Sequence, residues 1–254
     1  MIRTLCLIAA FSFVLAVGCF AGVIASAGGP FFIDDRGVVH HIDWSHPHDW
    51  SHPDVDEQDR AAPDRPGAPS TPRQFTWPGG RRLVIDVPAD VTYTQGPKIQ
   101  LTISGPEELI SRLSVQDGVI EADGIDFDDG RLKISLTAPD VDSFSIDGDA
   151  DLTIAGYNRD QLALKISGSG TAKAEGQAKR AELRISGSGD ADLSGLKLGD
   201  ARVHIAGSGD ATLDPKGEAV IDISGSGDVR LVTRPRSETV NISGSGRVDQ
   251  PDAG

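Results

Sequence analysis

Five histidines lie close together near the N-terminal end of the chain, and side chains of this type can hold a metal ion. They are His40, His41, His46, His48 and His52. Two aspartates, Asp43 and Asp49, begin tandem copies of the sequence DWSHP and can add oxygen ligands. Imidazole and carboxylate groups suit Zn²⁺, Cu²⁺ and Ni²⁺. The spacing matches no closed site and prolines keep the segment open, so two interpretations remain: weak Zn²⁺, Ni²⁺ or Cu²⁺ binding, or a solvated segment that binds no metal. No other cofactor is expected.

A second group of side chains that could bind a ligand recurs along the C-terminal half of the chain. Asp190, Asp210 and Asp228 each follow a Gly-Ser-Gly sequence, and stacking would place them in one outward column. In the calcium-binding β-roll repeat, the aspartate has the same parity as the apolar residue two positions later. Here Leu193 follows Asp190 by three positions, which excludes that roll. The column is therefore predicted to be either solvated surface or a weak site for a cation or polar ligand, since stacked carboxylates repel one another.

Enzymatic chemistry finds little support in the sequence. Catalysis needs a nucleophile with its base, or paired carboxylates with a positioned cation. His204 is the only histidine after the N-terminal group, and it lies on the outward parity of a strand without a Ser-His-Asp arrangement. Gly-Ser-Gly occurs five times with no helix or lysine motif after it, so it is not a phosphate loop. Arg184 and Arg230 are scattered cations, which leaves a carbohydrate-active enzyme as an alternative by fold analogy alone.

A repeated element must position all of these residues. Close copies of Ile185–Leu193 (ISGSGDADL) recur along the chain, and a blurred copy precedes them. The copies start at Ile146, Ile166, Ile185, Ile205, Ile223 and Ile242, at intervals of 20, 19, 20, 18 and 19 residues. A fixed period in this range is typical of a solenoid.

Within each copy the residues alternate in polarity, which predicts a strand with one buried face. One coil cannot bury its apolar face alone, so the coils must stack. The sequence therefore predicts an all-β protein, a single-domain parallel β-helix with coils of about 19 residues. The residues expected in buried columns are Leu183, Ile185, Val203, Ile205, Ile221, Ile223, Val240 and Ile242. The residues expected outside are Arg184, His204 and Asp222.

The glycines of the repeat indicate close approach between coils. Gly187 and Gly207 are expected to lack room for a Cβ atom or to need a positive φ angle. Ser208, between two glycines, is expected to point outward.

The chain is predicted to have three parts. Residues 1–27 contain an uncharged apolar run that ends in Ala-Ser-Ala, typical of a cleaved signal peptide; a retained membrane anchor and a lipoprotein signal at Cys19 are the alternatives. Residues 28–75, rich in His, Pro and Asp, are predicted to be a disordered tether. Residues 76–250 form the β-helix, with irregular N-terminal coils over 76–145, one short helix near 105–110, and regular coils over 146–250.

Two phrases ahead of the repeats complete a family pattern. Phe75-Thr76-Trp77-x-Gly79 is followed by Leu83-x-Ile85-x-Val87-Pro88-Ala89, and then by the repeated Ile-Ser-Gly-Ser-Gly-Asp. Together they resemble the bacterial DUF2807 group, labelled as a "putative auto-transporter adhesin, head GIN domain". The resemblance covers residues 75–250. It implies an exported β-helix-like domain and supplies no catalytic residues.

These observations predict a non-enzymatic domain of the cell envelope or periplasm, with an adhesin-like binding or structural role. The expected partner is an envelope polymer, a cell surface or another protein. A net charge of −14 argues against nucleic acid and against anionic lipid, so contact with a membrane is expected only through an uncleaved N-terminal segment. A metal-binding envelope protein is the first alternative, and a carbohydrate-active enzyme is the second.

Overall fold

The structure is a computed structural model that describes residues 31–33, 39–41, 72–78, 80–124 and 130–251. The chain divides into two units, Met1–Ala62 and Pro63–Gly254. The predicted signal or anchor, residues 1–27, lies outside the described residues. Among the helices that are described, none combines the length and apolar character that crossing a membrane requires.

Part of the segment predicted to be a disordered tether is paired as strands. In the first unit, β1 (Phe31–Ile33) pairs antiparallel with β2 (Val39–His41). The first consists of Phe31, Phe32 and Ile33, which are residue types that favour strands. In the second unit, β3 (Arg73–Phe75) pairs antiparallel with β6, so the β-domain begins ahead of the expected residue 76.

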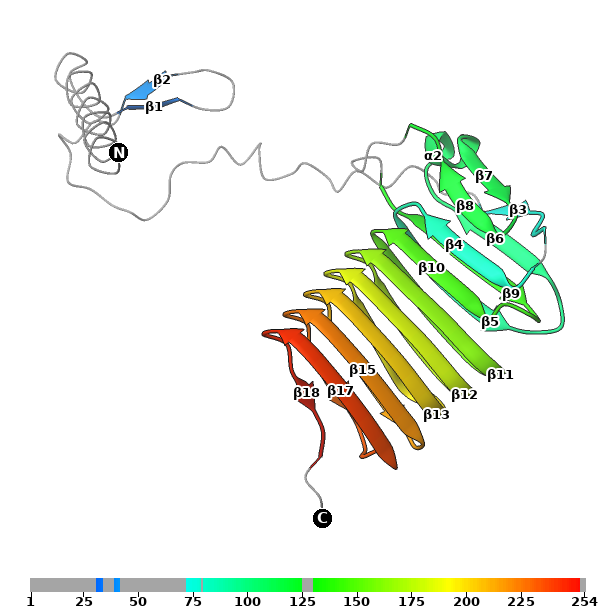
Figure 1. Cartoon of the computed structure of the whole chain (residues 1–254). Coiled ribbons are helices and arrows are strands. Elements are labelled where there is room, and N and C mark those ends of the chain that lie inside the picture. Colours follow the sequence, from blue (N-terminus) through cyan, green and yellow to red (C-terminus); the bar gives the residue numbers. More distant parts are fainter. Residues whose placement is uncertain (1–30, 34–38, 42–71, 79, 125–129, 252–254) are drawn as a thin grey trace, which may run out of the picture. The chain divides into compact units, whose positions relative to one another are not determined.

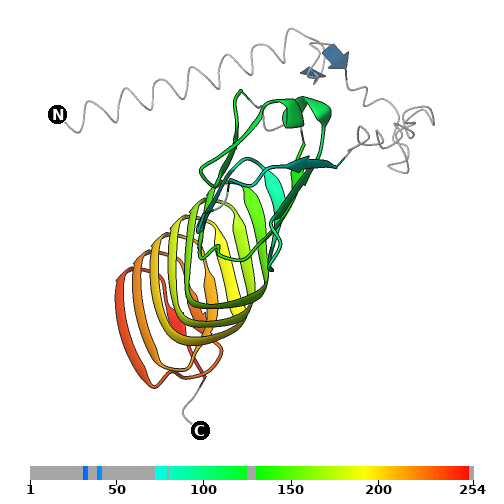
Figure 2. The ribbon, with the colours of Figure 1, turned by 90° about the vertical axis from the view of Figure 1, so that its right-hand side faces the viewer.

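The second unit is a parallel β-solenoid, as the period predicts (Figures 1 and 2). Its first strands are β4 (Arg82–Asp86), β5 (Ala89–Gln95), β6 (Gln100–Ser104), β7 (Leu113–Gln116), β8 (Val119–Ala122), β9 (Leu132–Ala138) and β10 (Ser143–Gly148). The long strands of the regular coils are β11 (Ala150–Gly168), β12 (Thr171–Gly187) and β13 (Asp190–Gly207). The last strands are β14 (Ala211–Pro215), β15 (Glu218–Gly225), β16 (Val229–Leu231), β17 (Ser237–Gly244) and β18 (Val248–Asp249).

Two parallel ladders run along the solenoid. We call the first face A: it comprises β4, β10, the C-terminal parts of β11, β12 and β13, and then β15 and β17. Figure 1 shows these strands side by side. Face B comprises β9, β5, the N-terminal parts of β11, β12 and β13, and then β14, β16 and β18. A third segment of each coil joins face B to face A.

The core consists of inward side chains stacked in register. One column on face A contains an isoleucine in every coil: Ile85, Ile146, Ile166, Ile185, Ile205, Ile223 and Ile242. Ile185 and Ile205 are at most 1% exposed, whereas Arg184 and His204 between the inward residues point to solvent. The predicted parity is therefore confirmed for these coils.

The last coil departs from that prediction. Val240 and Ile242 on β17 occupy inward positions but are 38% and 43% exposed. An inward side chain is covered partly by its own coil and partly by the coils on either side. Among the described strands, β17 pairs with β15 alone, so one side of both residues faces solvent. Burial of these two residues was wrongly expected from their parity.

The Gly-Ser-Gly turns bring successive coils into backbone contact. Gly207 has a φ of +141°, and a Cβ atom there would lie 2.1 Å from the carbonyl oxygen of Gly187. Gly187 has a φ of +127° and the same conflict with Gly168. Ser208 is exposed and its amide donates a 2.8 Å hydrogen bond to the carbonyl oxygen of Gly187. Both predicted reasons for glycine, the lack of room for a Cβ atom and the positive φ angle, are therefore confirmed.

The N-terminal end of the solenoid is closed by irregular elements. The short helix α2 (Glu107–Ser111) buries Leu109 and Ile110, and β7 pairs antiparallel with β8 beside it. The helix was expected from Gly105-Pro106 and the two glutamates, which suit its first turn.

Aromatic side chains fill the core next to this end. Tyr93 packs edge-on against Phe144, with ring centroids 5.0 Å apart, and Phe144 packs edge-on against Tyr157. Tyr93 donates a 2.8 Å hydrogen bond from its hydroxyl to the carbonyl oxygen of Ala138. Burial raises the pKa of Tyr93 to about 12 and also raises the pKa of Tyr157.

Candidate binding surfaces

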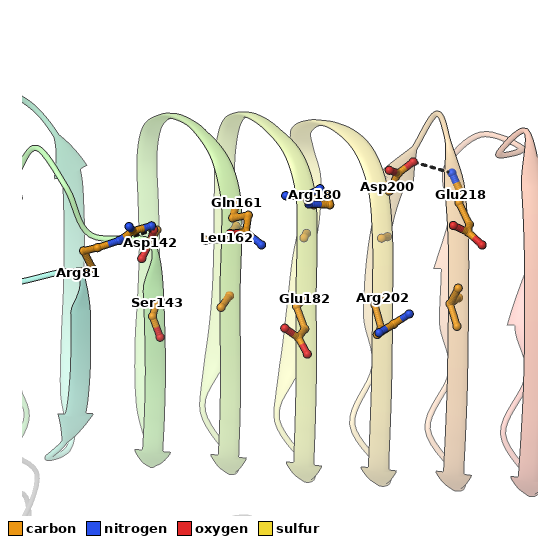
Figure 3. A pocket seen from close by; sticks show the side chains of 14 residues that line it. Arg81, Asp142, Ser143, Gln161, Leu162, Arg180, Glu182, Asp200, Arg202 and Glu218 are labelled. Atoms are coloured by element: carbon orange, nitrogen blue, oxygen red, sulfur yellow. Dashed lines mark hydrogen bonds and ion pairs between the residues drawn. The ribbon is translucent and has the colours of Figure 1, made fainter.

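A groove with a volume of about 470 Å³ crosses the coils at the edge of face A, where the joining segment meets the ladder (Figure 3). Its lining comes from residues at matching positions in successive coils. One row consists of Ala163, Glu182, Arg202 and Val220, and the neighbouring row consists of Gln161, Arg180 and Asp200. Because neighbouring strands are about 4.8 Å apart, each coil presents one member of a row per step. The groove therefore runs along the solenoid axis.

Most charges of the groove are already paired within the protein. Arg81 and Asp142 form an ion pair that includes a 2.9 Å hydrogen bond from Nε and raises the pKa of Arg81. Glu182 lies 2.5 Å from Arg184 in the same strand. Asp200 accepts a 2.9 Å hydrogen bond from the backbone amide of Glu218 (Figure 3).

Arg180 and Arg202 differ from these neighbours. No carboxylate of the described residues lies within ion-pair distance of either guanidinium group. Both side chains are exposed, and they come from adjacent coils, β12 and β13. Small or apolar side chains at Ala163 and Val220 lie in the same groove. The groove can therefore offer two cationic hydrogen-bond donors beside a small apolar surface.

The acidic column of the sequence lies on face B. Asp190, Asp210 and Asp228 occupy matching positions, and each carboxylate accepts a hydrogen bond from the backbone of the next coil. Asp190 accepts from the Asp210 amide at 2.9 Å, Asp210 from the Asp228 amide at 2.8 Å, and Asp228 from the Arg247 amide at 3.1 Å. The repeated aspartate thus links coils through side chain to backbone bonds.

Cations flank both ends of this column. At one end Arg131 contacts Asp90, Asp149 and Asp151 at 3.1, 3.2 and 2.8 Å. At the other end Arg247 lies 2.7 Å from Asp228. These arginines offset part of the repulsion between stacked carboxylates.

A shallow groove of about 390 Å³ accompanies the acidic column. Within residues 72–78, 80–124 and 130–251, no group of three or more His, Cys, Asp or Glu side chains is arranged to hold a metal ion. One oxygen of each aspartate is already engaged by a backbone amide. Binding of a cation or polar ligand by Asp190, Asp210 and Asp228 stays a prediction.

The histidines are separated by the structure into different units. His204 is on face A, where its neighbours in the ladder are Arg184 and Asp222. His40 and His41 belong to β2, and His46, His48 and His52 lie outside the described residues. Metal binding by the N-terminal histidines also stays a prediction.

The groove residues Arg180 and Arg202 were missed by sequence reasoning. They are 22 residues apart and belong to no motif. A signal was present in the period, because shifts of 19 or 20 residues align Gln161 with Arg180 and Arg180 with Asp200. That alignment predicts the rows of residues that line the groove. It does not show which arginines have no carboxylate of the described residues within ion-pair distance.

Comparison with known proteins identifies the family. The family model DUF2807, described as "Putative auto-transporter adhesin, head GIN domain", matches residues 81–235. This range includes every residue that lines the groove. The chain belongs to the DUF2807 family. The description of DUF2807 is that of an adhesin and not of an enzyme. No curated protein matches the chain.

Solved structures are similar to this DUF2807 chain, and the one with a TM-score above 0.5 shows the shared fold. One is a "putative adhesin" of Bacteroides fragilis, 21% identical, with a TM-score of 0.60; the match covers 72% of this chain and 97% of that one. Another is a "putative lipid binding protein" of Parabacteroides distasonis, 17% identical, with a TM-score of 0.47, covering 73% and 98% of the two chains. At these identities the likeness concerns the fold.

Proposed function

We propose that this DUF2807 protein is an exported, non-enzymatic adhesin-like domain that binds an acidic polysaccharide along the groove of face A. The domain acts in the periplasm or at the cell surface, after cleavage of residues 1–27. The observation that carries the proposal is the pair of arginines, Arg180 and Arg202, in a groove that runs across successive coils. Guanidinium groups bind carboxylates through directed, charge-assisted hydrogen bonds.

The shape of the groove favours an extended chain over a small molecule. Its rows repeat at the strand spacing, so a polymer lying along the solenoid axis meets equivalent backbone positions in several coils. Many weak contacts made together give avidity that no single contact supplies. The small side chains of Ala163 and Val220 leave room beside the arginines.

Four carboxylates line the groove beside three arginines, and three of these carboxylates have partners within the protein: Asp142 contacts Arg81, Glu182 contacts Arg184, and Asp200 accepts the Glu218 amide. The acidic column is on face B, whereas Arg180 and Arg202 are at the edge of face A. At physiological ionic strength, charges farther apart than about 8 Å are largely screened. Binding should therefore depend on the local arginines and weaken as salt increases.

The test compares binding of polygalacturonate, an acidic polysaccharide, with binding of dextran, a neutral one. The variant Arg180→Ala/Arg202→Ala should lose affinity for polygalacturonate about tenfold, which corresponds to about 1.4 kcal/mol. Arg230→Ala is the matched control, because Arg230 is an exposed arginine on face B. Equal binding by all three proteins would contradict the proposal. Shortening of the polysaccharide during the assay would instead indicate an enzyme.

A further inference from the structure

The C-terminal end of the solenoid presents an unpaired strand edge with an apolar inner side. β17 pairs with β15 on one side, and among the described strands none pairs with its other edge. Val240 and Ile242, on its inward side, are 38% and 43% exposed. The sequence of residues 239–246, TVNISGSG, contains neither a charge nor a proline. Charges and prolines are the usual protection of an exposed edge, so this edge is suited to pairing.

We infer that a second copy of this chain pairs with β17, so that two solenoids join end to end at their C-terminal coils around a two-fold axis. The strand is self-complementary around Asn241. An antiparallel pair centred there places Val240 opposite Ile242 of the second copy. It also places Asn241 opposite its own equivalent and Thr239 opposite Ser243. Residues of the same parity meet in such a pair, so the inward sides of both coils form one continuous core.

The second strand of the terminal coil supports the same symmetry. β18 pairs with β16 and also lies at the end of its ladder. Antiparallel pairing centred on Val248 brings Arg247 opposite Asp249 of the second copy, and the symmetry forms this opposite-charge pair twice. β17 and β18 flank the turn at Gly244–Gly246. A single two-fold axis that passes through both faces of the terminal coil can therefore relate the two β17 strands and also the two β18 strands.

The opposite end of the solenoid explains why association should stop at two copies. There, α2 covers the core, and Leu109 and Ile110 are 2% and 4% exposed. A head-to-tail contact that continues the core would need uncovered apolar side chains at both ends and would build a filament. With one end closed, only the tail-to-tail contact is available, and it is complete in a dimer.

The dimer would extend the candidate binding surface. A two-fold axis normal to face A leaves face A of both copies on the same side. The two grooves then lie on the same side of the dimer but at opposite edges of the combined face A, so a long partner can engage both only by crossing that face.

Cysteine substitution in the full-length chain, with Cys6 and Cys19 replaced by serine, tests the register. Asn241→Cys places a thiol on the axis, where paired Cα atoms are about 4.5–5.5 Å apart, within the range a disulfide spans. We expect a disulfide-linked dimer under oxidising conditions, with mass spectrometry identifying a peptide cross-linked to its own copy at position 241. Thr239→Cys and Ser243→Cys, as single variants, lie off the axis and should stay unlinked. The double variant Thr239→Cys/Ser243→Cys should link. Linking of both single variants, or of none of the four, would overturn the proposed pairing.

A charge substitution tests association without a covalent bond. Ile242→Lys places an ammonium group inside the proposed contact, and Ile99→Lys is the matched control because Ile99 is 56% exposed near the other end of the domain. Analytical ultracentrifugation should show a dimer for wild type and Ile99→Lys and a monomer for Ile242→Lys. Circular dichroism checks that all three are folded. A monomeric wild type, or an undiminished dimer of Ile242→Lys, would contradict the inference.

Discussion

At the scale of single residues, the fold depends on positions that admit one kind of side chain. The column of Ile185 and Ile205 on face A needs a large aliphatic group, because each side chain packs between equivalents in the coils before and after it. The turn glycines need the absence of a side chain, because the next coil's backbone occupies the space of a Cβ atom. Outward positions on the same strands tolerate Arg, His or Asp.

Replacement of a core isoleucine measures the first requirement. Ile205→Ala should lower the free energy of unfolding by about 2–5 kcal/mol, because Ile205 is fully buried and the cavity cannot close between fixed coils. His204→Ala, one position away and exposed, should change it by less than about 0.5 kcal/mol. Urea denaturation followed by circular dichroism gives both values. Equal effects of the two substitutions would mean that the two side chains are equally buried.

The turn glycines give a second prediction. Gly207→Ala should destabilise the solenoid by well over about 1 kcal/mol, because the new Cβ atom conflicts with the Gly187 carbonyl oxygen and the φ angle is positive. Ser208→Ala changes an exposed neighbour and should be nearly neutral. Thermal melting of the two variants provides the comparison, and a neutral Gly207→Ala would show that the turn can open.

The raised pKa values of the two tyrosines predict how the stability of the fold declines at alkaline pH. Burial raises the pKa of Tyr93 to about 12, above about 10 in the unfolded chain. A raised folded-state pKa means that this contribution to stability is complete below pH 10 and is lost as the pH rises toward 12. Tyr93 and Tyr157 are the only tyrosines, so ultraviolet absorbance of phenolate should appear together with loss of the β-sheet signal. Phenolate absorbance near pH 10 from protein that is still folded would contradict this prediction.

At the scale of elements, the coils are held in register by bonds that repeat with the sequence. Three of the five Gly-Ser-Gly turns are followed by an aspartate, and each of these aspartates accepts the amide of the corresponding residue in the next coil. This explains the recurrence of Asp190, Asp210 and Asp228 without a bound cation. The second oxygen of Asp228 contacts the Arg247 side chain, which leaves one oxygen of Asp190 and one of Asp210 for other contacts.

Substitution at Asp210 separates the structural role from cation binding. Asp210→Asn keeps an oxygen for the Asp228 amide and removes one charge from the column, so stability should be maintained. Asp210→Ala removes the acceptor and should be about 1 kcal/mol less stable than Asp210→Asn. The melting temperature of each protein is compared with Ca²⁺ and with a chelator. A Ca²⁺-dependent stabilisation that both substitutions abolish would identify a cation site instead.

Sequence periodicity was sufficient to predict the ladders. It was not sufficient to predict burial at the end of a ladder or the pairing of charged side chains on the surface. The parity of Ile185 and Ile205 and the turn at Gly207 followed from the repeat, because each repeat meets a copy of itself. Val240 was misjudged because its burial depends on coils on both sides, and among the described strands β17 pairs with β15 alone. The groove arginines were missed because their availability depends on which carboxylates lie beside them in space.

At the scale of the whole molecule, the two units of the chain have separate chemistry. The β-solenoid of Pro63–Gly254 carries the groove and the acidic column, whereas five of the six histidines belong to Met1–Ala62. A ligand of one unit need not alter the stability of the other.

That separation predicts the effect of metals. The full chain should bind Zn²⁺, Ni²⁺ or Cu²⁺ with micromolar affinity, because the spacing of the five histidines matches no closed site. Binding should fade below about pH 6.5, where imidazole becomes protonated. Replacing His40, His41, His46, His48 and His52 with alanine should abolish the heat of binding in calorimetry. The solenoid should melt at the same temperature with and without metal; a higher melting temperature would show that the metal binds the solenoid.

Equal coils also determine how the domain responds to a pulling force. A chain of about 19 residues extends to roughly 65 Å, while a stacked coil occupies only about 4.8 Å along the axis. Load applied to the C-terminal end would therefore detach one coil at a time, starting where Val240 and Ile242 are half covered. Each detachment lengthens the molecule greatly and leaves the next coil in nearly the same state as the last. A solenoid of this kind unfolds in steps, so the force that it transmits rises and falls with each coil that detaches.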